Sequence, residues 1–215
     1  MKLGLIGRKI GMTQLFNENG NHVPLTVIQA GPCVVIQKKT TKSDRYNAIQ
    51  LGFEEKKEKL TSKPLTGHFS KAGLKPKKIL MEMRLNDQDI EKYNVGDSIT
   101  IEKLEGCKFV DVTGTTKGRG FTGVAKRHGF QTPKKSHGTH DAFRHGGSLG
   151  SRFPQRVVPG RKMAGHYGNE RVTIQNLQVH SIRKDDHLIL VEGAVPGPNN
   201  SIVIIKPALK KAVQA

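Results

Sequence analysis

The chain has 215 residues, enough for one large domain or for a domain with an appendage around a real hydrophobic core. Its 36 Lys and Arg outnumber 18 Asp and Glu, so the formal net charge is +18 and the pI is about 10.1. A surplus of this size indicates a polyanionic partner, with nucleic acid as the first candidate, and leaves a basic protein without such a partner as the weaker alternative.

The cysteines and the chain start restrict the class of protein. Cys33 and Cys107 are single and far apart in sequence, which fits neither a disulfide framework nor a zinc spacing and indicates a reducing compartment. Arg8 and Lys9 interrupt the first apolar residues too early for a signal peptide. No stretch approaches the roughly 18 apolar residues of a membrane span. We therefore expect a soluble, intracellular protein without a membrane partner.

Short strands dominate both ends of the sequence. β-Branched and aromatic residues with Gly, Pro, Asn or Asp at many boundaries predict strands at 2–7, 12–16, 23–30, 33–39, 46–53, 78–85, 97–104, 108–112, 171–182, 187–195 and 201–209. A lysine-rich insertion at about 54–78 includes a predicted short helix near Leu65–Ala72, and a helical turn is predicted at 85–93. Many short strands with few helices indicate a mainly β domain, closed or nearly closed into a barrel. We assign residues 1–112 and 171–215 to it.

Residues 113–171 have a different composition. They hold 12 of the 24 glycines and 12 Lys and Arg, opposed only by Asp141 and Glu170. Only 13 of these 59 residues are apolar or aromatic, which is 22% against 35% for the whole chain. Such a stretch cannot bury enough surface to offset an ordering cost of about 1–2 kcal/mol per residue. We expect much of it to be mobile when free, and functional, as long insertions in compact domains usually are.

One glycine pattern in this segment raises the possibility of a dinucleotide site. Gly118, Gly120 and Gly123 spell G-x-G-x-x-G after a predicted strand, and Asp141 follows about 20 residues later, where an acid can hold a ribose. The fingerprint requires a βαβ unit with the acid at the end of a second strand, and the sequence around Asp141 has neither strand nor helix periodicity. No Walker loop and no kinase motif is present, so we expect no nucleotide cofactor.

The histidines of the segment allow two further interpretations. His137, His140 and His145 lie close in sequence beside Asp141, and imidazoles with a carboxylate can bind zinc. Metal ligands need rigid supporting partners, whereas this stretch is rich in glycine and lysine, so we expect no metal. A hydrolytic site using these groups with Ser148, or with His128 as a base, lacks a nucleophile elbow and the positioning on which rate depends.

Electrostatic binding of RNA explains the segment best. Lys and Arg neutralise phosphates, aromatic rings and guanidinium planes stack on unpaired bases, and glycine lets backbone approach closely in a crowded groove. A folded RNA with irregular crevices fits such a segment better than a uniform DNA duplex. The expected RNA contacts are Lys117, Arg119, Lys126, Arg127, His128, Lys134, Lys135, His137, His140, Arg144, His145, Arg152, Phe153, Arg156, Arg161, Lys162 and Arg171.

Four motifs in the same order resemble one family over nearly the whole chain. They are "GLIGRKIGMTQLF" at 4–16, "VDVTGTTKGRGFTGVAKRHGF" at 110–130, "GGSLG" at 146–150 and "GRKMAGHYGNERVTIQNL" at 160–177. The sequence resembles the universal large-subunit ribosomal protein L-three family in its bacterial form. Each motif alone is weakly specific, whereas their combination is highly specific.

The resemblance implies more than the residues alone. It implies a six-stranded barrel of the translation-protein type, with a central extension at 113–170 that threads into rRNA. It implies a structural, non-enzymatic protein of the cytoplasmic large ribosomal subunit, or of an organelle ribosome, that binds 23S rRNA and nucleates assembly. The implied neighbours are the ribosomal proteins L-fourteen and L-nineteen. The implied tip of the extension, near the peptidyl transferase centre, comprises Gly146, Gly147, Ser148, Leu149, Gly150 and Ser151.

The tip departs from the usual family pattern at one point. Ser151 stands where some relatives carry a methylated glutamine, so we expect no such modification here, and Arg152 and Phe153 follow it with contacts of their own. Two other functions stay open: an RNA-directed nuclease or modification enzyme that uses the histidines, and a protein that coats nucleic acid without preference for folded RNA.

Overall fold

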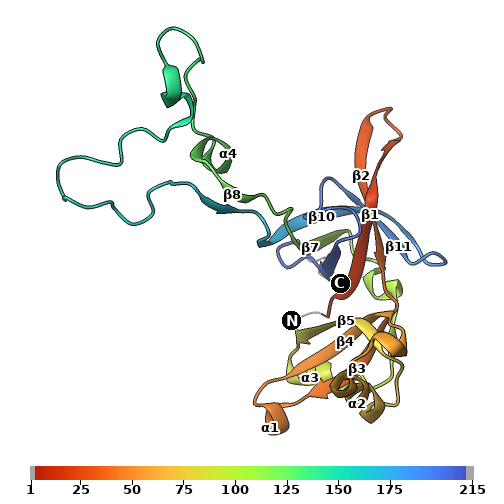
Figure 1. Ribbon diagram of the computed structural model, residues 1–215. Coiled ribbons are helices and arrows are strands. Elements are labelled where there is room, and N and C mark those ends of the chain that lie inside the picture. The colour runs from red at the N-terminus through yellow and green to blue at the C-terminus, as the bar shows by residue number, and fades with distance from the viewer. Residues whose placement is uncertain (1–2, 212–215) are drawn as a thin grey trace. The chain divides into compact units, whose positions relative to one another are not determined.

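The computed structural model describes residues 3–211 and divides the chain into two units (Figure 1). Unit 1 runs up to Thr115 and resumes at Arg171, and unit 2 is Thr116–Glu170. Within the described residues, no helix is both long enough and apolar enough to cross a membrane.

Six strands of unit 1 form an antiparallel sheet that closes on itself, because β2 pairs with both β11 and β1. Their order is β1 (Leu5–Phe16), β12 (Ile202–Pro207), β7 (Phe109–Thr115), β10 (Arg171–Arg183), β11 (Leu188–Glu192) and β2 (His22–Ala30). The register places Leu5 opposite Ile205, and Gly7 opposite both Val203 and Ala30. The prediction of a mainly β protein is confirmed.

A second sheet of unit 1 has the order β5 (Lys77–Arg84), β4 (Ala48–Glu55), β3 (Cys33–Lys39) and β6 (Ser98–Ile99). The sequence predicts these strands as part of the same barrel as the others. The structure separates them, because alternation of apolar and polar residues predicts a strand without specifying its neighbour. The lysine-rich insertion predicted at about 54–78 includes the ends of both strands, and residues 56–76 of it connect β4 to β5 within this second sheet.

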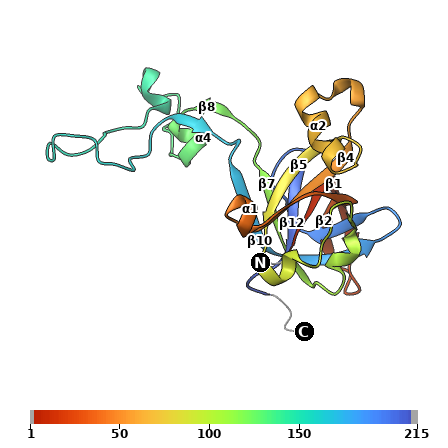
Figure 2. The same ribbon diagram turned by 90° about the horizontal axis from the view of Figure 1, so that it is seen from below.

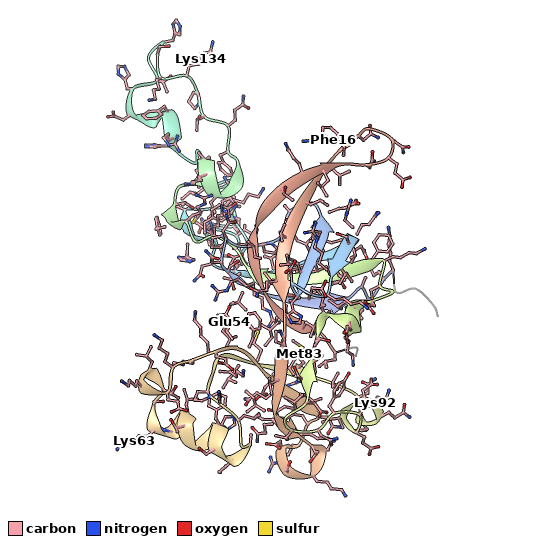
Figure 3. All side chains as sticks on the ribbon, turned by 90° about the vertical axis from the view of Figure 1, so that its right-hand side faces the viewer. Phe16, Glu54, Lys63, Met83, Lys92 and Lys134 are labelled. Atoms are coloured by element: carbon pink, nitrogen blue, oxygen red, sulfur yellow. The ribbon has the colours of Figure 1, made fainter. Side chains whose placement is uncertain are left out.

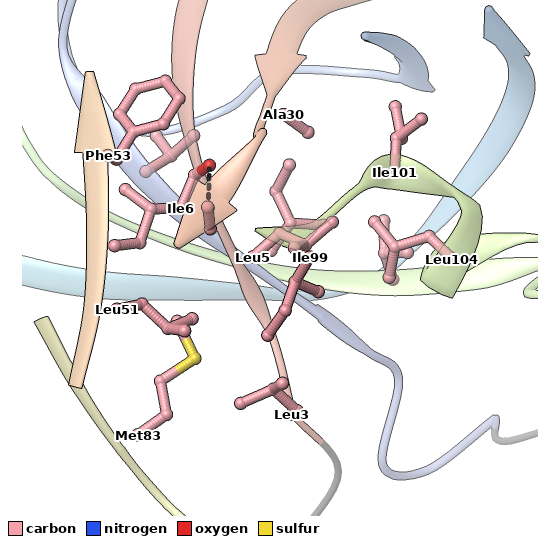
Figure 4. Packing of buried hydrophobic residues seen from close by; sticks show 14 of the residues in the cluster. Leu3, Leu5, Ile6, Ala30, Leu51, Phe53, Met83, Ile99, Ile101 and Leu104 are labelled. Atoms are coloured by element: carbon pink, nitrogen blue, oxygen red, sulfur yellow. Dashed lines mark hydrogen bonds between the residues drawn. The ribbon is translucent and has the colours of Figure 1, made fainter. Parts of the chain in front are cut away.

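One hydrophobic core joins the two sheets of unit 1. Leu5, Ile6 and Ile205 of the closed sheet belong to the same buried cluster as Leu51 and Met83 of the second sheet (Figure 4). The strands alternate as a half-buried sheet requires: in β12, Val203 and Ile205 are buried while their neighbours are partly exposed. This shared core makes the two sheets one compact body.

The helices of unit 1 are short and lie between strands. They are α1 (Thr41–Asp44), the 3₁₀ helix η1 (Glu58–Leu60), α2 (Lys63–Lys71), α3 (Asp87–Ile90) and the 3₁₀ helix η2 (Ile101–Leu104). The predictions of a helix near Leu65–Ala72 and of a helical turn at 85–93 are confirmed. Helix α2 packs on the second sheet (Figure 2), with Phe69 buried and His68 Nε2 2.7 Å from Gln50 Oε1 of β4.

Two strand predictions are wrong in detail. The strands predicted at 2–7 and 12–16 are one strand, β1, because a register shift between Lys9 and Gly11 absorbs the irregularity without ending the pairing. The strand predicted at 97–104 continues only to Ile99. Ile101 and Leu104 are three residues apart and both buried, a spacing that places them on one side of the 3₁₀ helix η2.

Candidate nucleic-acid interface

The base of unit 2 is a narrow two-stranded ribbon. Strand β8 (Gly120–Thr122) pairs antiparallel with β9 (Gly165–Tyr167), and the Arg119 N–H donates to the Tyr167 carbonyl oxygen at 2.8 Å. A Cβ atom at Gly168, where φ is +73°, would lie 2.1 Å from the Lys117 carbonyl oxygen. Glycine is therefore required here, because any side chain would separate the outgoing and returning segments of unit 2.

Helix α4 (Val124–His128) follows β8 and ties the two segments together through side chains. Arg127 Nη1 donates to the Met163 carbonyl oxygen at 2.9 Å, and His128 Nε2 lies 3.0 Å from the same oxygen. The Arg127 guanidinium occupies the space that a side chain on Gly165 would need. Arg127 and His128, both expected RNA contacts, thus also bond to the protein's own backbone.

Beyond α4, unit 2 is irregular and open. Residues 131–159 contain one regular element, the 3₁₀ helix η3 (His140–Arg144), and Lys135 Nζ lies 5.4 Å from the centre of the Phe143 ring. At the tip, Arg161 donates to the Ser148 carbonyl oxygen, and Leu149 and Phe153 are 54% and 72% exposed. Val124, near the base, is the one buried hydrophobic side chain of unit 2 among the described residues. Apolar packing therefore does not hold the distal part in place.

The structure places nearly all expected RNA contacts in unit 2; Arg171 is the exception, since it begins β10. Arg127 and His128 are half-buried and the others are exposed. Of the expected tip residues, Gly146 is half-buried and the other five are exposed. The expected contacts are spread along both segments and the tip of unit 2 instead of converging on one pocket.

The charges of the two units are balanced differently. In residues 3–211 every ion pair joins side chains of unit 1, such as Arg8 with Glu54 and Lys39 with Glu82 at 2.8 Å. Lys39 and the Tyr46 hydroxyl both donate to Glu82, which lowers the pKa of its carboxyl. The hydrogen bonds that Lys39 makes to Glu82 and to the Tyr46 hydroxyl raise the pKa of Lys39. Figure 3 shows side chains projecting along the whole of unit 2, among them Lys134. None of the cations of unit 2 has a carboxylate partner within residues 3–211.

The geometry does not support the cofactor and catalytic interpretations. Asp141 lies in η3, and β8 pairs antiparallel with β9, so the G-x-G-x-x-G stretch is not the turn of a βαβ unit. Within residues 3–211, no group of three His, Cys, Asp or Glu side chains is arranged to hold a metal ion. Burial raises the pKa of the Cys33 thiol to about 11, so it stays protonated and unreactive near neutral pH.

The set of expected contacts lacks two exposed rings at the base of unit 2, although the first of them, Phe121, is one of five aromatic residues that the sequence interleaves with the cations of this segment. Phe121 of β8 is 80% exposed, and the register places it directly opposite the exposed His166 of β9. The sequence shows Phe121 as the one aromatic residue of "GRGFTG", and the burial of Thr122 beside it is seen only in the structure. Pairing across the ribbon could not be read from the sequence, because 42 residues separate the two strands, and the strands contain few strand-forming residues.

The fold combines a closed β sheet with a long, exposed, cationic insertion. This combination defines a basic binding protein in which the candidate site is an exposed surface and not an enclosed pocket. The family model described as "Ribosomal protein L3" matches residues 36–188. The protein called "Large ribosomal subunit protein uL3" in Carboxydothermus hydrogenoformans is 50% identical over 210 residues, covering 98% of this chain and 99% of that one. The protein of the same name in Bacillus mycoides is 50% identical, covering 98% of this chain and 99% of that one. The one in Corynebacterium aurimucosum is 47% identical, covering 99% of this chain and 97% of that one.

The chain therefore belongs to the ribosomal protein L3 family. The members of this family are structural components of the large ribosomal subunit, which lies in the cytoplasm of bacteria, and are not enzymes. The resemblance inferred from the four sequence motifs is confirmed.

Proposed function

We propose that this protein binds 23S rRNA as a structural constituent of the large ribosomal subunit and that unit 2 is the part that enters the RNA. One observation carries the proposal: between Thr116 and Glu170, eleven Lys and Arg face two acidic residues, and none of these cations has a carboxylate partner within residues 3–211. Cations left unpaired in this density match a phosphate backbone, where each contact releases a counterion.

The two units have separate roles in this proposal. The closed six-stranded sheet of unit 1 is a barrel of the translation-protein type that docks on the surface of the subunit, where the ribosomal proteins L-fourteen and L-nineteen are its neighbours. Unit 2 is the central extension, at 113–170 in the sequence, and its tip at 146–151 reaches toward the peptidyl transferase centre. Binding early in assembly lets the protein nucleate folding of the surrounding rRNA.

A folded RNA suits unit 2 better than a DNA duplex does. Its exposed cations are distributed along two segments of irregular backbone, with η3 as the one regular element between residues 131 and 159. Duplex readout normally places a helix or a two-stranded ribbon in a regular groove. An irregular segment instead follows the crevices of a folded RNA, in which unpaired bases are available for stacking.

The salt dependence of binding tests the proposal. If unit 2 neutralises about six to ten phosphates, the plot of log affinity for 23S rRNA against log salt concentration should have a slope of roughly −4 to −9. A salt-independent affinity, or equal affinity for duplex DNA of the same length, would reject it. Sucrose-gradient fractionation of cell extract supplies the second test, since the protein should sediment with large subunits.

A further inference from the structure

The ribbon at the base of unit 2 has one packed face and one open face. Thr122 of β8 is 8% exposed, and opposite it Gly165 of β9 lies against the Arg127 side chain. Successive side chains of a strand point to opposite faces. Phe121 and His166, the neighbouring cross-strand pair, therefore point away from α4, and both are exposed.

The register places two aromatic side chains opposite each other on the open face. Residues directly opposite each other in an antiparallel pair have Cβ atoms about 4.5–5.5 Å apart, so both rings are within reach of one flat ligand. Phe121 is 80% exposed, the most exposed of the large hydrophobic side chains in the described chain. An isolated aromatic ring so exposed gains nothing from the protein's own core.

The surroundings of these rings are cationic. Lys117, Arg119, Lys126 and Lys162 are exposed and lie within a few residues of the pair along the chain, and Glu170 is the one nearby acid in sequence. The sequence around Phe121, "KGRGFTG", has no other apolar side chain. Around His166, "AGHYG" adds Ala164 and the 39% exposed Tyr167, and strand alternation directs the Tyr167 side chain to the face opposite His166. A ring pair flanked by cations matches a base attached to its phosphates, since aromatic stacking and phosphate neutralisation act together in single-strand binding.

We propose that Phe121 and His166 form a stacking platform for an unpaired base of the bound RNA. The proposal rests on the RNA-binding function proposed above and adds a specific contact to it. Stacking is tolerant of base identity, because every base has a π face, so the platform selects an unstacked nucleotide without reading its sequence.

The chain contains a matched control pair. Phe16 of β1 lies opposite His22 of β2 at the end of their hairpin, where Phe16 is 74% exposed and the two ring centres are 5.2 Å apart (Figure 3). This pair also joins a phenylalanine and a histidine across an antiparallel ribbon. Its sequence surroundings, "TQLFNENGNH", carry Glu18 and no lysine or arginine. It therefore tests whether an exposed Phe–His pair binds RNA without flanking cations.

Affinity for deproteinised 23S rRNA, measured with the full-length protein at several salt concentrations, tests the platform. Loss of a stacked base costs about 1–3 kcal/mol, so Phe121→Leu should weaken binding about 5- to 140-fold. The salt slope should not change, because phosphate contacts remain, and Phe121→Trp should retain affinity. Phe16→Leu should bind as the wild type does. If Phe121→Leu binds rRNA as tightly as the wild type does, the platform is overturned and the proposed rRNA binding is not. If the wild-type protein shows no preference for rRNA, the proposed function itself is overturned.

Photocrosslinking identifies the occupant directly. A photoreactive benzoylphenylalanine at position 121, incorporated into the protein in cells and irradiated in purified large subunits, should crosslink to one or a few unpaired nucleotides. A crosslink to a neighbouring protein, or to paired nucleotides only, contradicts the proposal. Thermal unfolding of each variant checks that unit 1 is intact, as expected for changes at exposed side chains.

Discussion

Unit 1 and unit 2 are stabilised in different ways. Unit 1 buries residues such as Leu5, Ile28 and Leu51 completely in a core shared by two sheets, and pairs lysines with carboxylates at its surface. Unit 2 has Val124 as its one buried hydrophobic side chain among the described residues, and its cations have no carboxylate partners there. The first unit carries the free energy of folding within itself, whereas the second, in the proposed function, is ordered by the RNA that it binds.

The base of unit 2 is intermediate between these extremes. The β8–β9 ribbon, the close approach of Gly168 to Lys117 and the bonds from α4 to Met163 hold the two segments together before any RNA is present. Because the base is joined in this way, the proposed function requires only residues 131–159 to be ordered on binding RNA. This reduces the entropy that binding must overcome, at about 1–2 kcal/mol for each residue ordered.

The largest effect is expected from a cavity in the core of unit 1. Leu51 is fully buried between the sheets, so Leu51→Ala should lower the free energy of unfolding by about 2–5 kcal/mol. Urea titration monitored by circular dichroism measures this change. Leu149→Ala at the exposed tip of unit 2 serves as the control, and it should change the free energy of unfolding by less than about 0.5 kcal/mol. Equal losses for the two variants would mean that the units do not differ as described.

Removal of two exposed cations from unit 2 should affect binding without affecting folding. Lys134→Ala combined with Lys135→Ala should make the slope of log affinity for rRNA against log salt shallower by about 1.4–1.8. The control removes the same charge from unit 1 at Lys92 and Lys184, which are paired with Asp89 and Glu105. A slope that changes equally in both double variants would show that net charge, and not its position in unit 2, determines binding.

A smaller effect is expected from loosening the base of unit 2. Arg127→Gln removes the guanidinium that donates to the Met163 carbonyl, a contact worth about 1 kcal/mol at a half-exposed site. Amide hydrogen exchange in β8 and β9 should become about fivefold faster in the free protein. The exposed Arg144→Gln should leave these rates unchanged. Unaltered exchange in the Arg127 variant would show that this side chain does not join the two segments.

The smallest effect is expected at the surface ion pair of unit 1. The lowered pKa of Glu82 stabilises the fold above the ordinary glutamate range, about pH 4–5, and this contribution is lost as pH falls through the lowered value. The raised pKa of Lys39 stabilises the fold at pH values below the ordinary lysine pKa, about 10.4. This stabilisation is lost as the pH rises through the raised pKa. Glu82→Gln should therefore lower the melting temperature slightly at pH 7, and the difference from wild type should vanish in acid. A difference that does not shrink as the pH is lowered from 7 to the acid limit of folding contradicts this assignment.

The sequence predicts local structure well where the signal is local. Alternating β-branched residues identify the strands at 23–30, 33–39 and 201–209, and proline with an apolar face identifies α2. Strand partners depend on contacts distant in sequence, which is why the second sheet was not separated from the first. Glycine content and charge mark out residues 113–171 without any structure.

Within the candidate interface, the sequence predicts charge better than geometry. It identifies the exposed cations, because an excess of Lys and Arg in an apolar-poor stretch cannot be buried. It does not predict that Arg127 turns toward Met163 or that Phe121 lies opposite His166, because both depend on the register between segments more than 30 residues apart. Those contacts define where unit 2 is already joined and where it remains open.

Hydrogen exchange of the full-length protein, free and bound to 23S rRNA, tests the central claim most directly. In the free protein, amides of the core strands should exchange slowly and those of residues 131–159 rapidly; on the RNA, exchange across 131–159 should become slow. If residues 131–159 of the free protein were already as protected as the core strands, unit 2 would have a stable structure of its own, and the account would be contradicted.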